Sequence, residues 1–160
     1  MNFFGEIFFK ITIVKSNKMR IIFLFILLIF PQSVIADLSP DGNKIVHTLN
    51  VKGSSKIFIT LLDGSNSKQI SKEQGNYYNP IWSPSGNKIA FEKKEGNKHY
   101  IGVMDANGLN ERMIALEFNV ESPFWSKDGK KIYYNVLDKF NNIKLFRVDI
   151  SGYNLKLIIK

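Results

Sequence analysis

The sequence predicts an all-β repeat protein, and three observations support that prediction. A turn motif of the form W-S-P-D-G occurs three times at spacings of 44 and 43 residues, with its glycines at Gly42, Gly86 and Gly129. A second set of turns keeps this period, with glycines 44 residues apart at Gly64, Gly108 and Gly152. Between the turns apolar and polar residues alternate as in half-buried strands, and no stretch after Ala36 keeps a helical period for twelve residues. Two sets of turns that share one period indicate tandem copies of one structural unit.

Residues 1–36 differ in kind from the repeats and are predicted to be a signal peptide. Ile21–Phe30 is a run of ten apolar residues, preceded by basic residues and followed by Pro31 and a short polar stretch that leads to Ala36. Ten residues of helix span only about half of a hydrocarbon core roughly 30 Å thick. An uncleaved anchor is therefore the alternative, and only in that case is contact with a membrane expected. Met19 is a second candidate for the translation start, because it directly precedes the apolar part of this segment.

The second repeat, residues 73–117, shows the predicted unit most clearly. A Pro-Ser-Gly-Asn turn at residues 84–87 connects two short apolar segments, because proline presets φ at the entry and glycine tolerates a positive φ at the exit. A polar loop and a second turn separate two further segments. Four strands are therefore expected, over residues 80–83, 88–92, 99–104 and 111–116.

The third and first repeats follow the same plan. The third repeat, residues 118–160, is expected to hold strands over 123–126, 131–135, 144–148 and 155–159. The first repeat, residues 37–72, is expected to hold strands over 44–48, 56–62 and 68–71. Because the expected cleavage point at Ala36 lies only two residues ahead of Leu38, this first unit is predicted to lack its first strand and to be incomplete.

Four short antiparallel strands in a repeat of this length are typical of a propeller blade, so the sequence predicts a partial β-propeller of three four-stranded antiparallel blades. Residues 80–91 (PIWSPSGNKIAF) and 101–108 (IGVMDANG) resemble the WD-like propeller repeat of the TolB type. That pattern reads P-x-W-S-P-D-G-x-x-I-A-F and then I-Y-V-M-D-A-D-G, and the resemblance covers residues 37–160. Ser85, Lys127 and Leu38 depart from its Asp, Pro and Trp, but each turn keeps its glycine.

Three blades do not close a propeller, which needs at least four. Each blade buries its faces only against its neighbours, so a stack of three is expected to leave two apolar faces bare. The leading expectation is that the chain is a fragment of a longer gene. The second is self-association of two copies to give six blades, the number that the resemblance to the TolB type implies. The third is that another protein supplies the missing blades.

The repeated turn residues are predicted to be structural, and no catalytic, cofactor-binding or metal-binding residue is predicted. A serine nucleophile needs a base and an oriented partner, whereas the serines of this motif recur at one turn position. One aspartate per repeat at a hairpin tip is likewise typical of a turn rather than of a calcium site. The recurring tryptophans favour a place in the blade core over a stacking platform. The motif comprises Ser39, Pro40, Asp41, Gly42, Trp82, Ser83, Pro84, Gly86, Trp125, Ser126, Asp128 and Gly129.

Composition narrows the classes of function further. The chain has no cysteine, which excludes disulfides, thiolate metal sites and a cysteine nucleophile. Its two histidines, His47 and His99, lack the spacing of metal ligands and are expected in strands as packed or rim residues. The net charge is +8, but the lysines are dispersed, with Lys44, Lys88 and Lys131 each beside a turn. A nucleic-acid-binding face is therefore not expected.

The resemblance to the TolB type implies a binding role rather than a reaction. It implies a non-enzymatic, secreted or periplasmic module of the Tol–Pal envelope system that contacts the peptidoglycan-associated lipoprotein through its propeller. It implies no particular partner-binding residues, and no counterpart of the α/β domain that precedes the propeller in that family is expected here. The alternative is the propeller of a larger secreted enzyme, either a prolyl-oligopeptidase-like peptidase or a polysaccharide lyase, without its catalytic domain.

Overall fold

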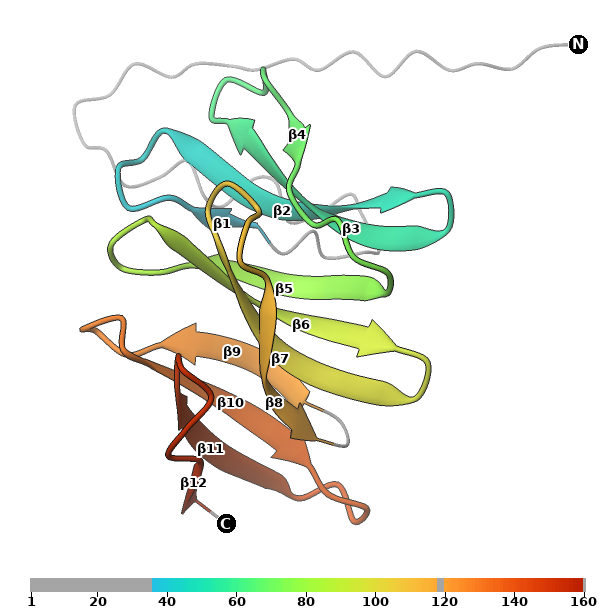
Figure 1. The fold of residues 1–160 in the computed structure, drawn as a ribbon, viewed down its shortest axis with the longest axis vertical. Coiled ribbons are helices and arrows are strands. Elements are labelled where there is room, and N and C mark those ends of the chain that lie inside the picture. The colour runs from blue at the N-terminus through green and yellow to red at the C-terminus, as the bar shows by residue number, and fades with distance from the viewer. Residues whose placement is uncertain (1–35, 118–119, 160) are drawn as a thin grey trace, which may run out of the picture. The chain divides into compact units, whose positions relative to one another are not determined.

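A computed structural model of the chain describes residues 36–117 and 120–159, which form three four-stranded antiparallel sheets (Figure 1). The four strands of each sheet are consecutive in sequence and pair in the order in which they occur. The first sheet holds β1 (Asp37–Leu38), β2 (Lys44–Val51), β3 (Ser54–Leu61) and β4 (Lys68–Gln69). The second holds β5 (Asn76–Trp82), β6 (Lys88–Glu95), β7 (Lys98–Asp105) and β8 (Arg112–Glu117). The third holds β9 (Val120–Trp125), β10 (Lys131–Leu137), β11 (Ile143–Asp149) and β12 (Lys156–Ile159).

The predicted all-β fold with three four-stranded antiparallel units is confirmed. Every element in the two described ranges is a strand, and each strand pairs with its neighbour in sequence through a turn or short loop. Within those ranges no helix has the length and apolar character needed to cross a membrane. The predicted signal peptide, residues 1–36, lies outside the described residues except for Ala36.

The expectation that the first unit lacks its first strand is wrong. Strand β1 is present, because Asp37 pairs with Val46 and Leu38 pairs with Ile45 of β2. The Asp37 carboxylate also accepts a hydrogen bond from the backbone N–H of Trp82 in the second sheet, with 2.7 Å between nitrogen and oxygen. Two residues ahead of the turn are therefore enough to form a short strand, since they are tied both to their own sheet and to the next one.

Strands β5 and β9 each contain a residue with a positive φ directly before a proline. These residues are Asn79 and Ser122, with φ angles of 48° and 53°. The pairing of β5 with β6 shifts register at this point, as does the pairing of β9 with β10. A bulge bends its strand and redirects the neighbouring side chains and N–H groups. Here both bulges direct a hydrogen-bond donor toward Glu92 in β6.

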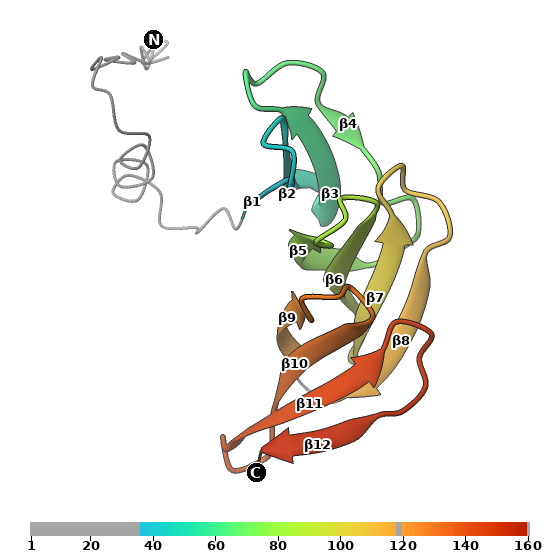
Figure 2. The same ribbon diagram turned by 90° about the vertical axis from the view of Figure 1, so that its left-hand side faces the viewer.

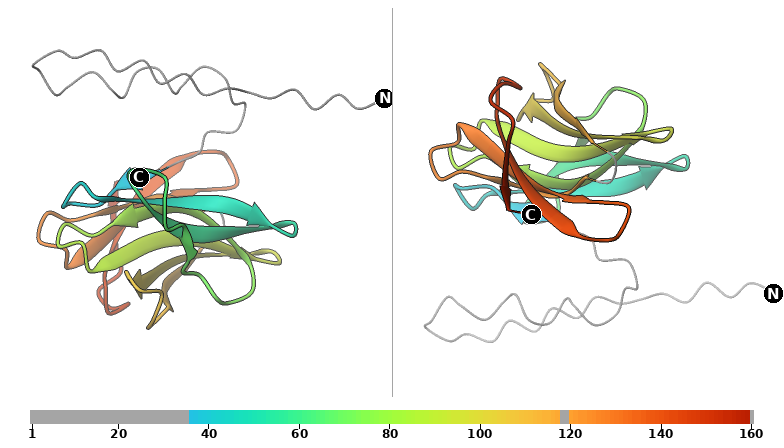
Figure 3. Two further views of the ribbon diagram at one scale, coloured as in Figure 1. Left: turned by 90° about the horizontal axis from the view of Figure 1, so that it is seen from above. Right: turned by 90° about the horizontal axis from the view of Figure 1, so that it is seen from below.

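Neighbouring sheets are joined by two apolar clusters. The cluster between the first and second sheets contains the aromatic pair Tyr77 and Phe91, whose ring centroids are 5.3 Å apart. The cluster between the second and third sheets includes Ile101 and Tyr134. Full burial of a large apolar side chain contributes about 1.5–3 kcal/mol. The joints between sheets, seen from the side in Figure 2 and from both ends in Figure 3, therefore hold the core of the repeat array.

Candidate functional site

The three repeated turns are held by hydrogen bonds of their own serines. The hydroxyl oxygens of Ser39, Ser83 and Ser126 each accept a hydrogen bond from the backbone N–H of the lysine five residues later, at 2.9, 3.0 and 2.9 Å. Ser39 and Ser126 also donate to the aspartate two residues later, both at 2.6 Å. Such contacts are typical of serines that stabilise a turn. That these motif residues have no catalytic role stays a prediction.

The two motif tryptophans lie at the joints between sheets. Trp82 belongs to the cluster between the first and second sheets and is 7% exposed. Trp125 packs against the cluster between the second and third sheets. Its indole Nε1 donates a hydrogen bond to the backbone oxygen of Ile81 in the second sheet at 3.3 Å. Both rings are therefore used in packing one sheet against the next.

Two of the three turn lysines are paired with aspartates of the second turn set. The Nζ of Lys88 lies 2.6 Å from Oδ1 of Asp105, and the Nζ of Lys131 lies 3.1 Å from Oδ1 of Asp149. The hydrogen bond from Lys88 is the main cause that lowers the pKa of the Asp105 carboxyl. Salt bridges between side chains as exposed as these contribute little to stability. The main effect of the two pairs is therefore to connect the two turns of one sheet.

The two histidines occupy different environments. His47 lies in β2, stacks on Phe58 and has its Nε2 2.8 Å from Oγ1 of Thr60. His99 lies in β7, where it borders a pocket. Burial lowers the pKa of both imidazoles. In the part of the chain that the structure describes, no three His, Asp or Glu side chains are grouped so that they could hold a metal ion.

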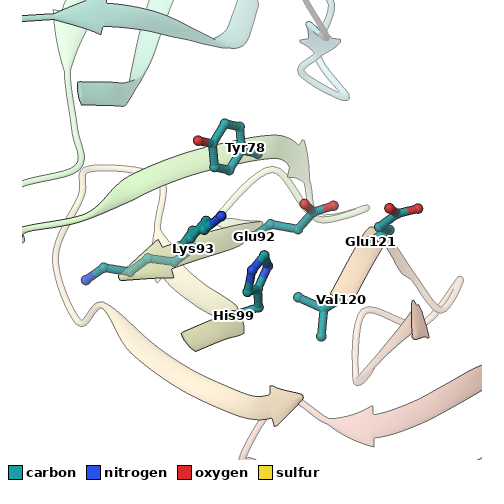
Figure 4. Close-up of a pocket in the computed structure, with 7 residues that line it drawn as sticks. Tyr78, Glu92, Lys93, His99, Val120 and Glu121 are labelled. Atoms are coloured by element: carbon teal, nitrogen blue, oxygen red, sulfur yellow. The ribbon is translucent and has the colours of Figure 1, made fainter. Parts of the chain in front are cut away.

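A polar pocket of about 260 Å³ lies at the joint between the second and third sheets (Figure 4). Strands β5, β6 and β7 supply its walls on one side, and the start of β9 supplies the other. Glu92, His99 and Glu121 surround the same hollow in Figure 4. The complete lining consists of Tyr78, Glu92, Lys93, Lys94, His99, Val120 and Glu121.

Glu92 is one of two buried charged residues in the lining of this pocket, the other being Lys93. The Glu92 side chain extends from β6, and the residue is only 9% exposed. Its Oε1 accepts a hydrogen bond from the Asn79 amide of its own sheet and another from the backbone N–H of Ser122 in the third sheet, both at 2.5 Å. Burial raises the pKa of the Glu92 carboxyl, and the nearby charge of Glu121 raises it further, while the two hydrogen bonds oppose that shift.

A second buried polar group lies next to the joint between the first and second sheets. The Nζ of Lys93 is 3.2 Å from Oε1 of Glu111, and these side chains are 8% and 9% exposed. The Tyr77 hydroxyl donates to the same oxygen at 2.7 Å, and the Nζ of Lys93 lies 5.1 Å from the Tyr77 ring centroid. Burial, followed by the hydrogen bond to Glu111, raises the pKa of the Tyr77 hydroxyl. The members of this group satisfy one another, which fits a structural role.

The lining of the pocket is mostly polar and charged. Its seven lining residues include no serine, threonine or cysteine that could act as a nucleophile beside His99. The Glu92 carboxylate already receives two hydrogen bonds from the protein, whereas Glu121 is exposed. The lining also contains Lys93 and Lys94, so it presents charged groups of both signs and matches a polar ligand.

No sequence motif pointed to Glu92, Tyr77 or Glu111 as important residues. Glu92 shares a face of β6 with Ala90, which belongs to the cluster against the third sheet. One feature of the sequence could have indicated Glu92. The second of three blades is covered on both faces, so a charged residue within its strands needs partners in a neighbouring blade.

Sheets that repeat the same turns, bulges and joints along the chain define a β-propeller repeat protein. The family model described as the TolB beta propeller domain matches residues 30–160. The chain therefore belongs to the TolB β-propeller family.

The curated proteins that are similar to this chain in sequence include TolB proteins. The chain is 35% identical over 91 residues to the Tol-Pal system protein TolB of Wolbachia sp. subsp. Drosophila simulans (strain wRi), a match that covers 57% of this chain and 22% of that protein. It is 38% identical over 65 residues to dipeptidyl-peptidase 5 of Porphyromonas gingivalis, which covers 37% of this chain and 10% of the peptidase. The chain thus corresponds to about a fifth or less of each of these relatives.

Solved structures show the same fold in proteins of several functions. TolB from Acinetobacter baumannii superposes with a TM-score of 0.67 at 20% identity, covering 79% of this chain and 32% of that one. A puromycin-hydrolyzing peptidase from Mycobacterium tuberculosis gives a TM-score of 0.64 at 15% identity, covering 79% and 23%. An oligogalacturonate lyase in complex with manganese gives 0.59 at 15% identity, covering 76% and 40%. These similarities concern the fold alone.

Proposed function

We propose that this protein is a non-enzymatic, protein-binding module of the TolB type that acts in the bacterial periplasm or outside the cell. The family match over residues 30–160, together with the 35% identity to a Tol-Pal system protein, carries the proposal. The hydrogen bonds that engage the motif serines in turns support the non-enzymatic part. The match spans only 22% of that relative, so the role of the whole relative is carried over here as a proposal.

The proposed partner is a peptidoglycan-associated lipoprotein, and the polar pocket is the proposed contact region. Tyr78 is 40% exposed at the pocket, and Glu121 beside it is also exposed. Tyrosine is enriched in protein interfaces because it combines a large apolar ring with a hydrogen-bonding hydroxyl. A carboxylate at the rim supports recognition of a basic or hydrogen-bond-donating surface.

Capture of purified peptidoglycan-associated lipoprotein by the immobilised chain tests this proposal. We expect saturable binding at micromolar concentration, and about a tenfold weaker affinity for a Glu121→Lys variant. Glu73→Lys is the matched control, because Glu73 is also exposed but does not line the pocket. No enrichment of the lipoprotein by the unaltered chain would overturn the partner. Equal binding by both variants would overturn the pocket as the contact region.

The second candidate function is the propeller of a larger secreted enzyme. The similarity to dipeptidyl-peptidase 5 in sequence, and to a peptidase and a lyase in structure, favours this alternative. It predicts that the DNA flanking this reading frame encodes an adjacent hydrolase or lyase domain. Tol–Pal genes in the same neighbourhood favour the first function instead.

We also propose that two copies of the chain associate and complete a ring of six blades. Each described joint buries an apolar cluster between consecutive sheets. On the third sheet Phe124 is 46% exposed, and on the first sheet Leu62 is 58% exposed. Covering such surfaces is a general reason for association between repeats.

A further inference from the structure

Consecutive motif turns touch in the same way at both joints. A Cβ atom placed on Gly86 would lie 3.6 Å from Cδ of Pro40, the proline of the preceding turn. A Cβ atom placed on Gly129 would lie 3.7 Å from Cδ of Pro84. The proline of each turn therefore lies next to the glycine of the next turn, close enough to contact a side chain placed there.

The second set of turns makes its own repeated contact. A Cβ atom placed on Gly108 would collide with the backbone oxygen of Ile70, and one placed on Gly152 would lie 3.7 Å from the backbone oxygen of Ile114. Both isoleucines are buried, at 2% and 7% exposure. The residue two positions before each of these glycines, Ala106 or Ile150, packs against the apolar cluster of that joint.

The first sheet has the same glycine positions as the second and third sheets, but in the described chain no preceding sheet packs against them. No atom lies within 4 Å of a Cβ placed on Gly42 or on Gly64. Leu62 occupies the position of Ala106 and Ile150, yet it is 58% exposed. The first sheet thus presents an apolar side chain and two open glycines where the other two sheets are in contact with a preceding sheet.

The third sheet has the positions that, in the first and second sheets, contact the following sheet. Ile158 occupies the position of Ile70 and Ile114 and is 40% exposed. Lys127 occupies the position of the prolines that contact the following turn, and it is also exposed. The two ends of the array therefore present opposite halves of one and the same joint.

We infer that the third sheet of one copy docks on the first sheet of a second copy, with Ile158 against Leu62 and Gly64, and with Lys127 over the turn at Gly42. This inference rests on the self-association proposed above and names its surface. The Lys127 ammonium would then approach the exposed carboxylate of Asp41, so the replacement of proline by lysine adds charge complementarity at this joint.

The interface is head-to-tail, because two different surfaces meet. A head-to-tail contact forms a closed ring when the rotations close, and an open chain when they do not. Two copies give six sheets, which lies within the range of about four to eight blades that closed propellers use. A closed dimer therefore contains this joint twice. In each case the third sheet of one copy meets the first sheet of the other copy.

Light scattering coupled to size-exclusion chromatography of the full chain tests the joint. We expect a dimer, and at least a tenfold higher dissociation constant for Leu62→Lys and for Ile158→Lys. The matched control is Phe140→Lys, which adds the same charge at a hairpin tip that is 74% exposed and outside the repeated contacts. A monomer at all concentrations would overturn the self-association and the joint together. A dimer whose affinity changes equally, or not at all, in all three variants would overturn the joint alone.

Cross-linking tests the direction of the contact. Because the chain has no cysteine, Asn43→Cys and Lys127→Cys each introduce a single thiol. We expect a short bismaleimide to link the two variants when they are mixed and to link neither variant to itself. Links within either variant alone, or higher polymers in light scattering, would contradict a closed head-to-tail dimer.

Discussion

The backbone N–H of Ser122, at a bulge of the third sheet, donates a hydrogen bond of 2.5 Å to Oε1 of Glu92 in the second sheet. The side-chain amide of Asn79, at the corresponding bulge of the second sheet, donates to the same oxygen. One buried carboxylate therefore connects two bulges that occupy equivalent positions in consecutive repeats. This arrangement makes the joint between the second and third sheets dependent on the charge state and shape of Glu92.

Replacement of Glu92 by leucine is expected to destabilise the fold. The substitution removes the acceptor of two partly buried hydrogen bonds, from the Asn79 amide and the Ser122 N–H, and a hydrogen bond to a charged group contributes about 1.5–3 kcal/mol. Urea denaturation should show a free energy of unfolding lower by about 2–4 kcal/mol, and Glu92→Gln, which keeps an acceptor oxygen, should lose less. Equal stability of Glu92→Leu and the unaltered chain would contradict this role.

The contribution of Glu92 should depend on pH. Burial raises its pKa above the ordinary value of 4.5, so the folded state holds the proton more tightly than the unfolded state does. The associated stability is fully present below the unfolded pKa and is lost as pH rises through the raised folded pKa. The free energy of unfolding of the unaltered chain, minus that of Glu92→Gln, should therefore increase as pH falls from neutral toward 4.5. Urea titrations at several pH values measure it, and a constant or decreasing difference would contradict the assignment.

Removal of the Tyr77 hydroxyl should destabilise the second repeat, which contains both Tyr77 and Glu111. Tyr77→Phe keeps the ring beside Lys93 but deletes the hydrogen bond to Glu111, and a hydrogen bond to a charged group contributes about 1.5–3 kcal/mol. Tyr78→Phe is the control, since Tyr78 is 40% exposed, and it should change stability by less than about 0.5 kcal/mol. Thermal or urea unfolding gives both values, and similar losses in the two variants would be inconsistent with the buried pair.

The three motif serines should respond alike to truncation. Ser39→Ala, Ser83→Ala and Ser126→Ala each remove an acceptor for a backbone N–H in an equivalent turn. Each change should cost about 1 kcal/mol in the free energy of unfolding. Binding to the lipoprotein partner should change little in all three. One serine whose replacement abolishes a function while stability is kept would indicate a catalytic or binding role at that position.

Alanine substitutions at two glycines distinguish the cost of a positive φ from the cost of a clash at the joint between the first and second sheets. Gly53 and Gly108 have φ angles of 84° and 81°, so alanine at either position costs about 1–2 kcal/mol for its conformation. Of these two positions, only Gly108 is so placed that the added Cβ would also collide with the backbone oxygen of Ile70. Gly108→Ala should therefore lose about 1–3 kcal/mol more than Gly53→Ala in urea denaturation. Equal losses would mean that the second turn does not rest on the first sheet.

The architecture was predictable because the repeat is defined by turn residues that are close together in sequence. Proline and glycine fix the turns, and the alternation between the turns fixes strands and faces. Strand β1 was missed because two residues carry no measurable period, and its stability comes from pairing with β2 and from the hydrogen bond between Asp37 and Trp82. Strand ends also differ, since β5 begins at Asn76 rather than at the expected residue 80.

The candidate site was less predictable than the fold. Glu92, Glu121 and His99 come from three different strands of two sheets, and their proximity follows from the joint rather than from any spacing in sequence. The pairing of Lys93 with Glu111 likewise depends on strand register and on burial by the first sheet. Motif spacing predicts which residues recur, whereas these residues do not recur between repeats.

Nuclear Overhauser effects between consecutive turns test most directly whether each blade rests on the next through its motif. The structure places Pro40 against Gly86 and Pro84 against Gly129. We predict cross-peaks between the Cδ protons of Pro40 and the Cα protons of Gly86, and between those of Pro84 and Gly129. Assigned spectra in which both pairs of cross-peaks are absent would contradict the stacking of the repeats.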